Sequence, residues 1–186
     1  MRYMTIEREY GSGGTKIARQ LAKETNIPCY GEEILQRASE HMNMPIEQIR
    51  ECEEKATNSL LYSIYMFSQA QSRDRDMLAK EGKVFVEEQK VILEFASKGS
   101  AIFLGHCASE ALKEYDGVIS VFIYADKEFK RERIRTDYGI AEDKIDAVER
   151  KNNKRRANYY SVNTQNKWSD LRNYDIVLNS SKLGID

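Results

Sequence analysis

One short segment, Gly11-Ser12-Gly13-Gly14, constrains the fold of this chain more than any other. It separates an apolar run at residues 3–6 from an amphipathic segment that opens at Thr15. A loop that surrounds phosphate needs backbone N–H groups that point inward, and glycine adopts the required dihedral angles most freely. A helix that follows adds partial positive charge at its N-terminus. The order strand, glycine turn, helix therefore predicts a phosphate-binding loop.

The loop departs from the P-loop pattern G-x-x-x-x-G-K-[ST] at two positions. Gly13 matches the second glycine, and Thr15 matches the hydroxyl residue that binds Mg²⁺. Arg8 stands in place of the first glycine, and Gly14 stands in place of the lysine. Phosphoryl transfer without that lysine requires another cation on the same phosphate oxygens. A plain glycine turn between a strand and a helix is the competing interpretation.

The composition favours a helix-rich cytoplasmic protein. The chain has 186 residues, 32% of them charged, only two prolines and a net charge of −1, which gives no reason to expect a nucleic-acid partner. No apolar run approaches the ~18 residues of a membrane span, and the N-terminus does not resemble a signal peptide. The three cysteines show no CxxC spacing, so disulfides and a thiolate zinc site are not expected. Two histidines exclude a histidine-rich metal site.

The remaining apolar segments alternate between strand and helix patterns. We predict strands at residues 27–30, 100–104, 118–125 and 174–178. Helices are predicted at 15–25, from Pro45 to about 67, at 83–98, from about 126 to 138 with Asp126 as its cap, and at 141–160. This alternation predicts an open parallel sheet that binds ligands at the carboxyl ends of its strands. Residues 8–14, 105–107 and 125–126 fall at that edge.

Three separated blocks of the sequence resemble the cytidylate kinase-like family of P-loop proteins. The first is REYGSGGTKIARQLA at the N-terminus, and the second is the turn Gly105-His106-Cys107-Ala108. The third begins with KNNKRRANYY and continues through Thr164, Lys167-Trp168, Asp170, Asn173-Tyr174-Asp175 and Leu178-Asn179-Ser180. The blocks follow the family order from residue 5 to residue 180, which is nearly the whole chain.

The resemblance implies a three-layer α/β P-loop NTPase fold with a five-stranded parallel sheet, order 2-3-1-4-5, flanked by helices. It implies a single P-loop kinase-like domain over residues 1–186, with an acceptor-binding helical insert at about 31–82 and a lid at about 135–160. It also implies ATP with Mg²⁺ as the phosphoryl donor and a nucleoside monophosphate, CMP or dCMP by the family name, as the acceptor. The expected partners are therefore small-molecule nucleotides, with no nucleic acid and no membrane.

The loop pattern and the resemblance together indicate three groups of site residues. The phosphate loop is Gly11, Ser12, Gly13, Gly14, Thr15 and Lys16, with Thr15 as the Mg²⁺ ligand. The catalytic cations are Arg8, Arg133, Lys154, Arg155 and Arg156, and the acceptor residues are Tyr30 and His106. Other interpretations stay open: Lys16 can point to solvent, Arg8 can form a surface ion pair, and the basic segment 151–156 can be a solvated face. Asp170 and Asp175 are equally compatible with ligand contacts and with loop caps.

Several positions depart from the family pattern. Thr15 replaces an arginine after Gly-Gly, Asn153 replaces the lid aspartate, and Gly31 replaces an aspartate after the second strand. His106 replaces an arginine that could hold phosphate through a charged fork, whereas histidine is mostly neutral at pH 7. Two alternatives therefore stand beside a cytidylate kinase: a degenerate nucleotide-binding module, and a kinase of another small acceptor. The apolar helix at 44–67 could also form a homodimer seam.

Overall fold

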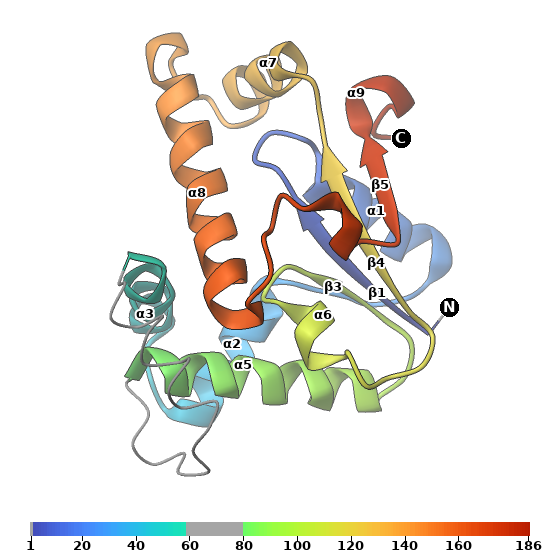
Figure 1. Cartoon of the computed structure of the whole chain (residues 1–186), viewed down its shortest axis with the longest axis vertical. Helices are drawn as coiled ribbons and strands as arrows, with labels where there is room; N and C mark the ends of the chain where they lie inside the picture. Colours follow the sequence, from blue (N-terminus) through green and yellow to red (C-terminus); the bar gives the residue numbers. More distant parts are fainter. Residues whose placement is uncertain (1, 59–79) are drawn as a thin grey trace.

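Five parallel strands form the centre of the protein. A computed structural model describes residues 2–58 and 80–186 of the chain (Figure 1). The strands are β1 (Tyr3–Arg8), β2 (Cys29–Tyr30), β3 (Ala101–Leu104), β4 (Val118–Tyr124) and β5 (Ile176–Asn179). Their order is β2-β3-β1-β4-β5, and all four pairings are parallel, which confirms the predicted sheet. The glycine loop therefore leaves the central strand.

Helices follow each strand. They are α1 (Gly14–Thr25), α2 (Glu32–Met42), α3 (Ile46–Asn58), α5 (Lys80–Ser97), α6 (Ala108–Ala111), α7 (Lys127–Asp137), α8 (Ile145–Thr164) and α9 (Ser180–Leu183). Two short 3₁₀ turns occupy Glu142–Lys144 and Leu171–Asn173. No helix within the described part of the chain has the length and apolar character that crossing a membrane requires.

Alternating strand residues divide the helices into two layers. Ile6, Val121 and Ile123 face one side of the sheet, where they pack with Ala18 of α1. Tyr3 and Phe103 face the other side, where the buried partners come from α2, α5 and α6. Figure 1 shows α1 behind the sheet and α5 crossing in front of its lower end. The predicted three-layer α/β fold is confirmed.

The predicted elements match the structure except at a few places. Residues 32–42 lie within the predicted helical insert, but the bounds of α2, which buries Ile34, Leu35 and Ala38, were not predicted. The helix predicted from Pro45 is described only as far as α3, so its continuation and the proposed dimer seam at 59–67 lie outside the described residues. Asp126 occupies the N-cap position of α7, as predicted, but its side chain makes no cap bond and instead accepts from Asn179 Nδ2 at 3.0 Å.

Both acidic residues that the sequence left open have structural partners. Asp170 caps the 3₁₀ turn that follows it, where it accepts a hydrogen bond from the backbone N–H of Arg172 at 3.2 Å. Asp175 accepts from both the backbone N–H and the hydroxyl of Ser120 at 2.8 Å. The Asp175 bonds hold the start of β5 against β4, and the two sets of bonds account for both carboxylates without a ligand.

A buried carboxylate connects the central strand to the C-terminal part of the chain. Glu7 on β1 is buried and accepts a hydrogen bond from Trp168 Nε1 at 3.0 Å. Trp168 is itself buried, with its ring 5.0 Å from that of Phe122 on β4. The tryptophan therefore contributes a buried hydrogen bond as well as apolar packing.

We expect Trp168→Phe to lower the free energy of unfolding by about 1–3 kcal/mol, because it leaves the Glu7 carboxylate without this donor. Urea unfolding followed by far-ultraviolet circular dichroism measures the change. Tyr115→Phe is the control, since Tyr115 is an exposed aromatic residue. Equal stability of the Trp168 variant and the wild type would contradict this role for the indole N–H.

Candidate functional site: the glycine loop and its cavity

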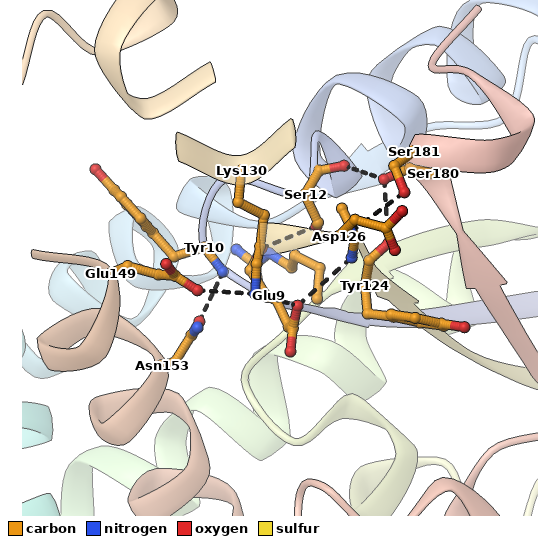
Figure 2. Close-up of polar contacts among 12 residues, drawn as sticks. Glu9, Tyr10, Ser12, Tyr124, Asp126, Lys130, Glu149, Asn153, Ser180 and Ser181 are labelled. Carbon is orange, nitrogen blue, oxygen red and sulfur yellow. Dashed lines mark hydrogen bonds and ion pairs between the residues drawn. The ribbon is translucent and has the colours of Figure 1, made fainter. Parts of the chain in front are cut away.

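The loop between β1 and α1 has the conformation that its glycines permit. Gly11 and Gly13 have φ values of 84° and 81°, in the left-handed region that favours glycine. Ser12 between them is fully buried, and its hydroxyl donates to the carbonyl of Glu9 at 2.9 Å. The hydroxyl of Ser180, at the start of α9, donates to the carbonyl of Ser12 at 2.6 Å. The loop is thus held from within and from the end of β5 (Figure 2).

Gly14 stands where the P-loop pattern has lysine, and its surroundings exclude a side chain. A Cβ atom on Gly14 would lie 2.6 Å from Cβ of Arg8 and 3.0 Å from its Cγ. Such contacts are far shorter than van der Waals distances, and both Cβ atoms are fixed to backbone. The start of α1 packs directly on the end of β1, so the missing lysine is a consequence of this packing.

Helix α7 covers one side of the loop. A Cβ on Gly11 would lie 3.1 Å from Cβ of Lys130, and Nζ of Lys130 is 2.8 Å from carboxylate oxygens of both Glu9 and Glu149. Figure 2 shows this ammonium between the loop and α8. Burial lowers the pKa of Lys130, but the carboxylates of Glu149 and Glu9 outweigh burial and raise it. The sequence analysis missed this buried cation.

Helix α8 is bonded directly to the loop. The side-chain oxygen of Asn153 accepts from the backbone N–H of Tyr10 at 2.7 Å (Figure 2). Arg156 donates through Nη1 to the carbonyl of Arg8 at 2.7 Å, and its guanidinium lies over the Tyr10 ring at 5.8 Å. Positions 153 and 156 share one face of the helix. The segment expected to act as a lid therefore already contacts the loop.

A cavity of about 260 Å³ lies where β1, β3, α1, α2, α3 and α8 meet. Five arginines line it: Arg8, Arg19, Arg50, Arg155 and Arg156. Burial lowers the pKa of Arg8, and burial together with the charge of Arg8 lowers the pKa of Arg156 to about 9. The Nε atom of Arg8 is buried without a hydrogen-bond partner among residues 2–58 and 80–186. Glu7 also lines the cavity and acts against the lowering of both pKa values, but neither arginine forms an ion pair within the described part of the chain, so the cavity is suited to bind an anion.

The structure brings most of the predicted site residues to this cavity or to the loop. Thr15, Arg155 and His106 line the cavity together with the two buried arginines. Arg133 lies on the α7 side, where its Nε would be 3.5 Å from a Cβ on Gly13 and is buried with no hydrogen-bond partner that the structure describes. Its Nη2 is 2.6 Å from the carboxylate of Asp137. The predicted cations thus flank the loop on two sides.

Three predicted residues lie elsewhere. Lys16 is 59% exposed, with its ammonium 3.6 Å from the carboxylate of Asp186. Lys154 is exposed and lines a separate shallow hollow between α3 and α8. The Tyr30 ring stacks on Phe95 with centroids 4.1 Å apart, which explains it by core packing. Their roles in binding remain predictions.

A second polar cluster borders the cavity at the end of β3. His106 has a φ of 54°, and its Nδ1 is 3.3 Å from Oε1 of Glu53 and 3.6 Å from Oε2 of Glu88. The hydroxyl of Tyr159 donates to Oε2 of Glu88. Burial and the charge of Glu53 raise the pKa of Glu88 to about 7. Burial lowers the pKa of His106, but the two carboxylates outweigh it and raise the pKa to about 10.

This environment changes the expectation for His106. The sequence analysis treated it as mostly neutral, whereas the raised pKa makes it a cation at pH 7. The carboxylates of Glu53 and Glu88 neutralise the positive charge of His106, so His106 does not offer a ligand the free charge that an arginine would. No motif indicated these two glutamates, because only the tertiary structure brings them to the histidine.

The profile of the cytidylate kinase-like family matches residues 3–182. The chain belongs to this family. Its members are kinase-like P-loop proteins, which supports a nucleotide-dependent kinase in general and leaves the acceptor open. No curated protein matches the sequence.

Solved structures show the same fold. An uncharacterized protein from Eubacterium ventriosum is 26% identical, with a TM-score of 0.71 over 100% of this chain and 92% of that chain. TT1252 from Thermus thermophilus is 17% identical, with a TM-score of 0.53 over 95% of this chain and 87% of that one.

Because the start of α1 rests on Arg8, we expect Gly14→Ala to lower the free energy of unfolding by about 1–3 kcal/mol. Chemical denaturation measures this change. Gln20→Ala on the same helix is the control, with an expected change within about 0.5 kcal/mol. Wild-type stability of the Gly14 variant would show that the loop can shift to admit a side chain.

Proposed function

We propose that this protein transfers the γ-phosphoryl group of ATP to a nucleoside monophosphate, with CMP or dCMP as the first acceptors to test. The observation that carries the proposal is the junction of the glycine loop with a cavity lined by arginines from both β1 and α8. Family membership supports kinase chemistry in general. The nucleotide acceptor and its base rest on the family name and on the cationic cavity.

The loop and its neighbours supply the parts that phosphoryl transfer needs. Backbone N–H groups of the loop and the N-terminus of α1 offer donors and partial positive charge to the ATP phosphates. The hydroxyl of Thr15, at the second position of α1, fits the role of a Mg²⁺ ligand; the ion neutralises phosphate charge when it is bound. Arg8, Arg155 and Arg156 neutralise charge on the transferring group in place of the lysine.

A kinase of another small acceptor is the second candidate. Glu53 and Glu88 face His106 at the end of β3, where a phosphate of the acceptor is expected. Carboxylates oppose a phosphate at close range, so this end of the cavity favours an acceptor that carries hydroxyl or amino groups there. The two candidates share the donor site and differ only in the acceptor.

The direct test measures ADP formation from Mg-ATP with CMP, dCMP, UMP, AMP and GMP as acceptors. We expect turnover that depends on an added pyrimidine monophosphate. Turnover with none of the five, on folded protein that Mg-ATP stabilises against heat, would contradict nucleoside monophosphate transfer. That result would favour the second candidate or a binding module without kinase activity.

We expect Arg8→Ala to lower acceptor-dependent turnover by at least about 100-fold, because Arg8 lines the cavity together with Thr15 and the arginines of α8. Arg135→Ala is the matched control, since Arg135 is exposed on α7 and pairs with Glu132. Circular dichroism verifies that both variants fold. Unchanged turnover of the Arg8 variant would show that other cations take the role that the P-loop lysine has in the standard pattern.

A further inference from the structure

Three potential metal ligands converge beside the cavity from three separate elements. Glu53 lies on α3, Glu88 on α5 and His106 in the turn after β3. One ligand atom from each lies within 4.8 Å of the others, and this is the one such group of three among the described residues. We call these three residues the Glu-Glu-His cluster. It is separate from Thr15, the expected ligand of the ATP-bound Mg²⁺.

The distances within the cluster match a metal site better than hydrogen bonds. Four ligands at the usual ~2.0–2.1 Å from a tetrahedral ion lie about 3.4 Å from one another. Nδ1 of His106 is 3.3 Å from Glu53 Oε1 and 3.6 Å from Glu88 Oε2. Despite these neighbours, Nδ1 is buried without a well-formed hydrogen bond to any residue that the structure describes. All three ligand atoms lie within 4.8 Å of one another, so one ion could bind between them. Binding would release the proton that His106 carries at pH 7 without metal.

Glu88 gives an independent indication of a missing ligand. Its side chain is 0% exposed, and its Oε1 has no hydrogen-bond partner within residues 2–58 and 80–186. The other oxygen accepts from the Tyr159 hydroxyl, an arrangement that orients metal-binding carboxylates. A fully buried carboxylate with an unsatisfied oxygen is costly, and buried charges are usually paired or coordinate metals.

We propose that the Glu-Glu-His cluster binds a divalent transition-metal ion, with Zn²⁺ as its representative. One imidazole nitrogen with two carboxylates suits Zn²⁺ or Mn²⁺, whereas Mg²⁺ prefers six oxygen ligands in an octahedron. Glu53 and His106 also line the cavity, so a remaining coordination position faces it. That position can hold water or an oxygen of a small molecule bound there. The proposal does not depend on which acceptor the protein uses.

A second histidine provides a matched comparison within the same chain. His41 also lies near two glutamates, with Nδ1 2.8 Å from Glu87 and Nε2 3.5 Å from Glu94. Opposite ring nitrogens face these two carboxylates, so no single ion can bridge all three groups. Both groups therefore contain one histidine and two glutamates. In the Glu-Glu-His cluster both carboxylates approach the same ring nitrogen, whereas at His41 they approach different nitrogens.

Isothermal titration of the chelator-treated full chain with Zn²⁺, and separately with Mg²⁺, tests the proposal without any nucleotide. We expect one Zn²⁺ per chain and much weaker binding of Mg²⁺. His106→Gln and Glu53→Gln should each weaken Zn²⁺ binding by about 100-fold or more. His41→Gln and Glu87→Gln should leave it unchanged.

Absorption of the Co²⁺-loaded protein separates this site from one at a cysteine. We expect the d–d bands of four-coordinate cobalt, lost in His106→Gln, without a thiolate charge-transfer band. Glu88→Gln should also lose the bands if it folds. Glu53 is partly exposed, so Glu53→Gln is expected to fold and provides the same test if Glu88→Gln does not. Failure of folded wild-type protein to bind Zn²⁺, or undiminished binding by His106→Gln, would overturn the proposal.

Discussion

The contact between Gly14 and Arg8 is the constraint on which the site depends. Because a Cβ on Gly14 would lie 2.6 Å from Cβ of Arg8, the first turn of α1 can rest on the end of β1 only if residue 14 has no side chain. The same contact removes the place for a lysine and positions an arginine beneath the loop. The cavity arginines therefore come from several elements: Arg8 from β1, Arg19 from α1, Arg50 from α3, and Arg155 and Arg156 from α8.

Cations on two helices lie beside the loop, although those on α7 are already paired with carboxylates, Lys130 with Glu9 and Glu149 and Arg133 with Asp137. Lys130 and Arg133 approach from α7, whereas Arg156 bonds to the end of β1 from α8. The Glu9–Lys130–Glu149 ion pairs connect both helices to the loop. Burial lowers the pKa of Arg8 and Arg156, which means that their positive charges are unfavourable in the cavity. A bound phosphate would stabilise these charges, and the arginines would neutralise the phosphate. Donors fixed in place before the ligand arrives are the ones most effective in phosphoryl transfer.

The sequence predicted the sheet well because its strands are unbroken apolar runs whose flanking helices cover both faces. It also located the glycine loop, whose φ values only glycine adopts easily. Lys130 was not predicted as a buried residue because it lies in a highly charged segment. In such a segment the sequence does not distinguish a buried lysine from an exposed one. The Glu-Glu-His cluster escaped because its members lie on α3, on α5 and after β3, and no local spacing relates them. Tyr30 was assigned to the acceptor, but stacking on Phe95 depends on tertiary packing that the sequence does not encode locally.

The affinity of Gly14→Lys for Mg-ATP tests most directly whether arginines have replaced the lysine. The packing of α1 on Arg8 predicts that the variant is less stable than the wild type and binds Mg-ATP no more tightly. Calorimetric titration at matched ionic strength measures the dissociation constants. A folded variant of wild-type stability that binds Mg-ATP tenfold more tightly would contradict the account, because it would show that the loop still has room and need for a lysine.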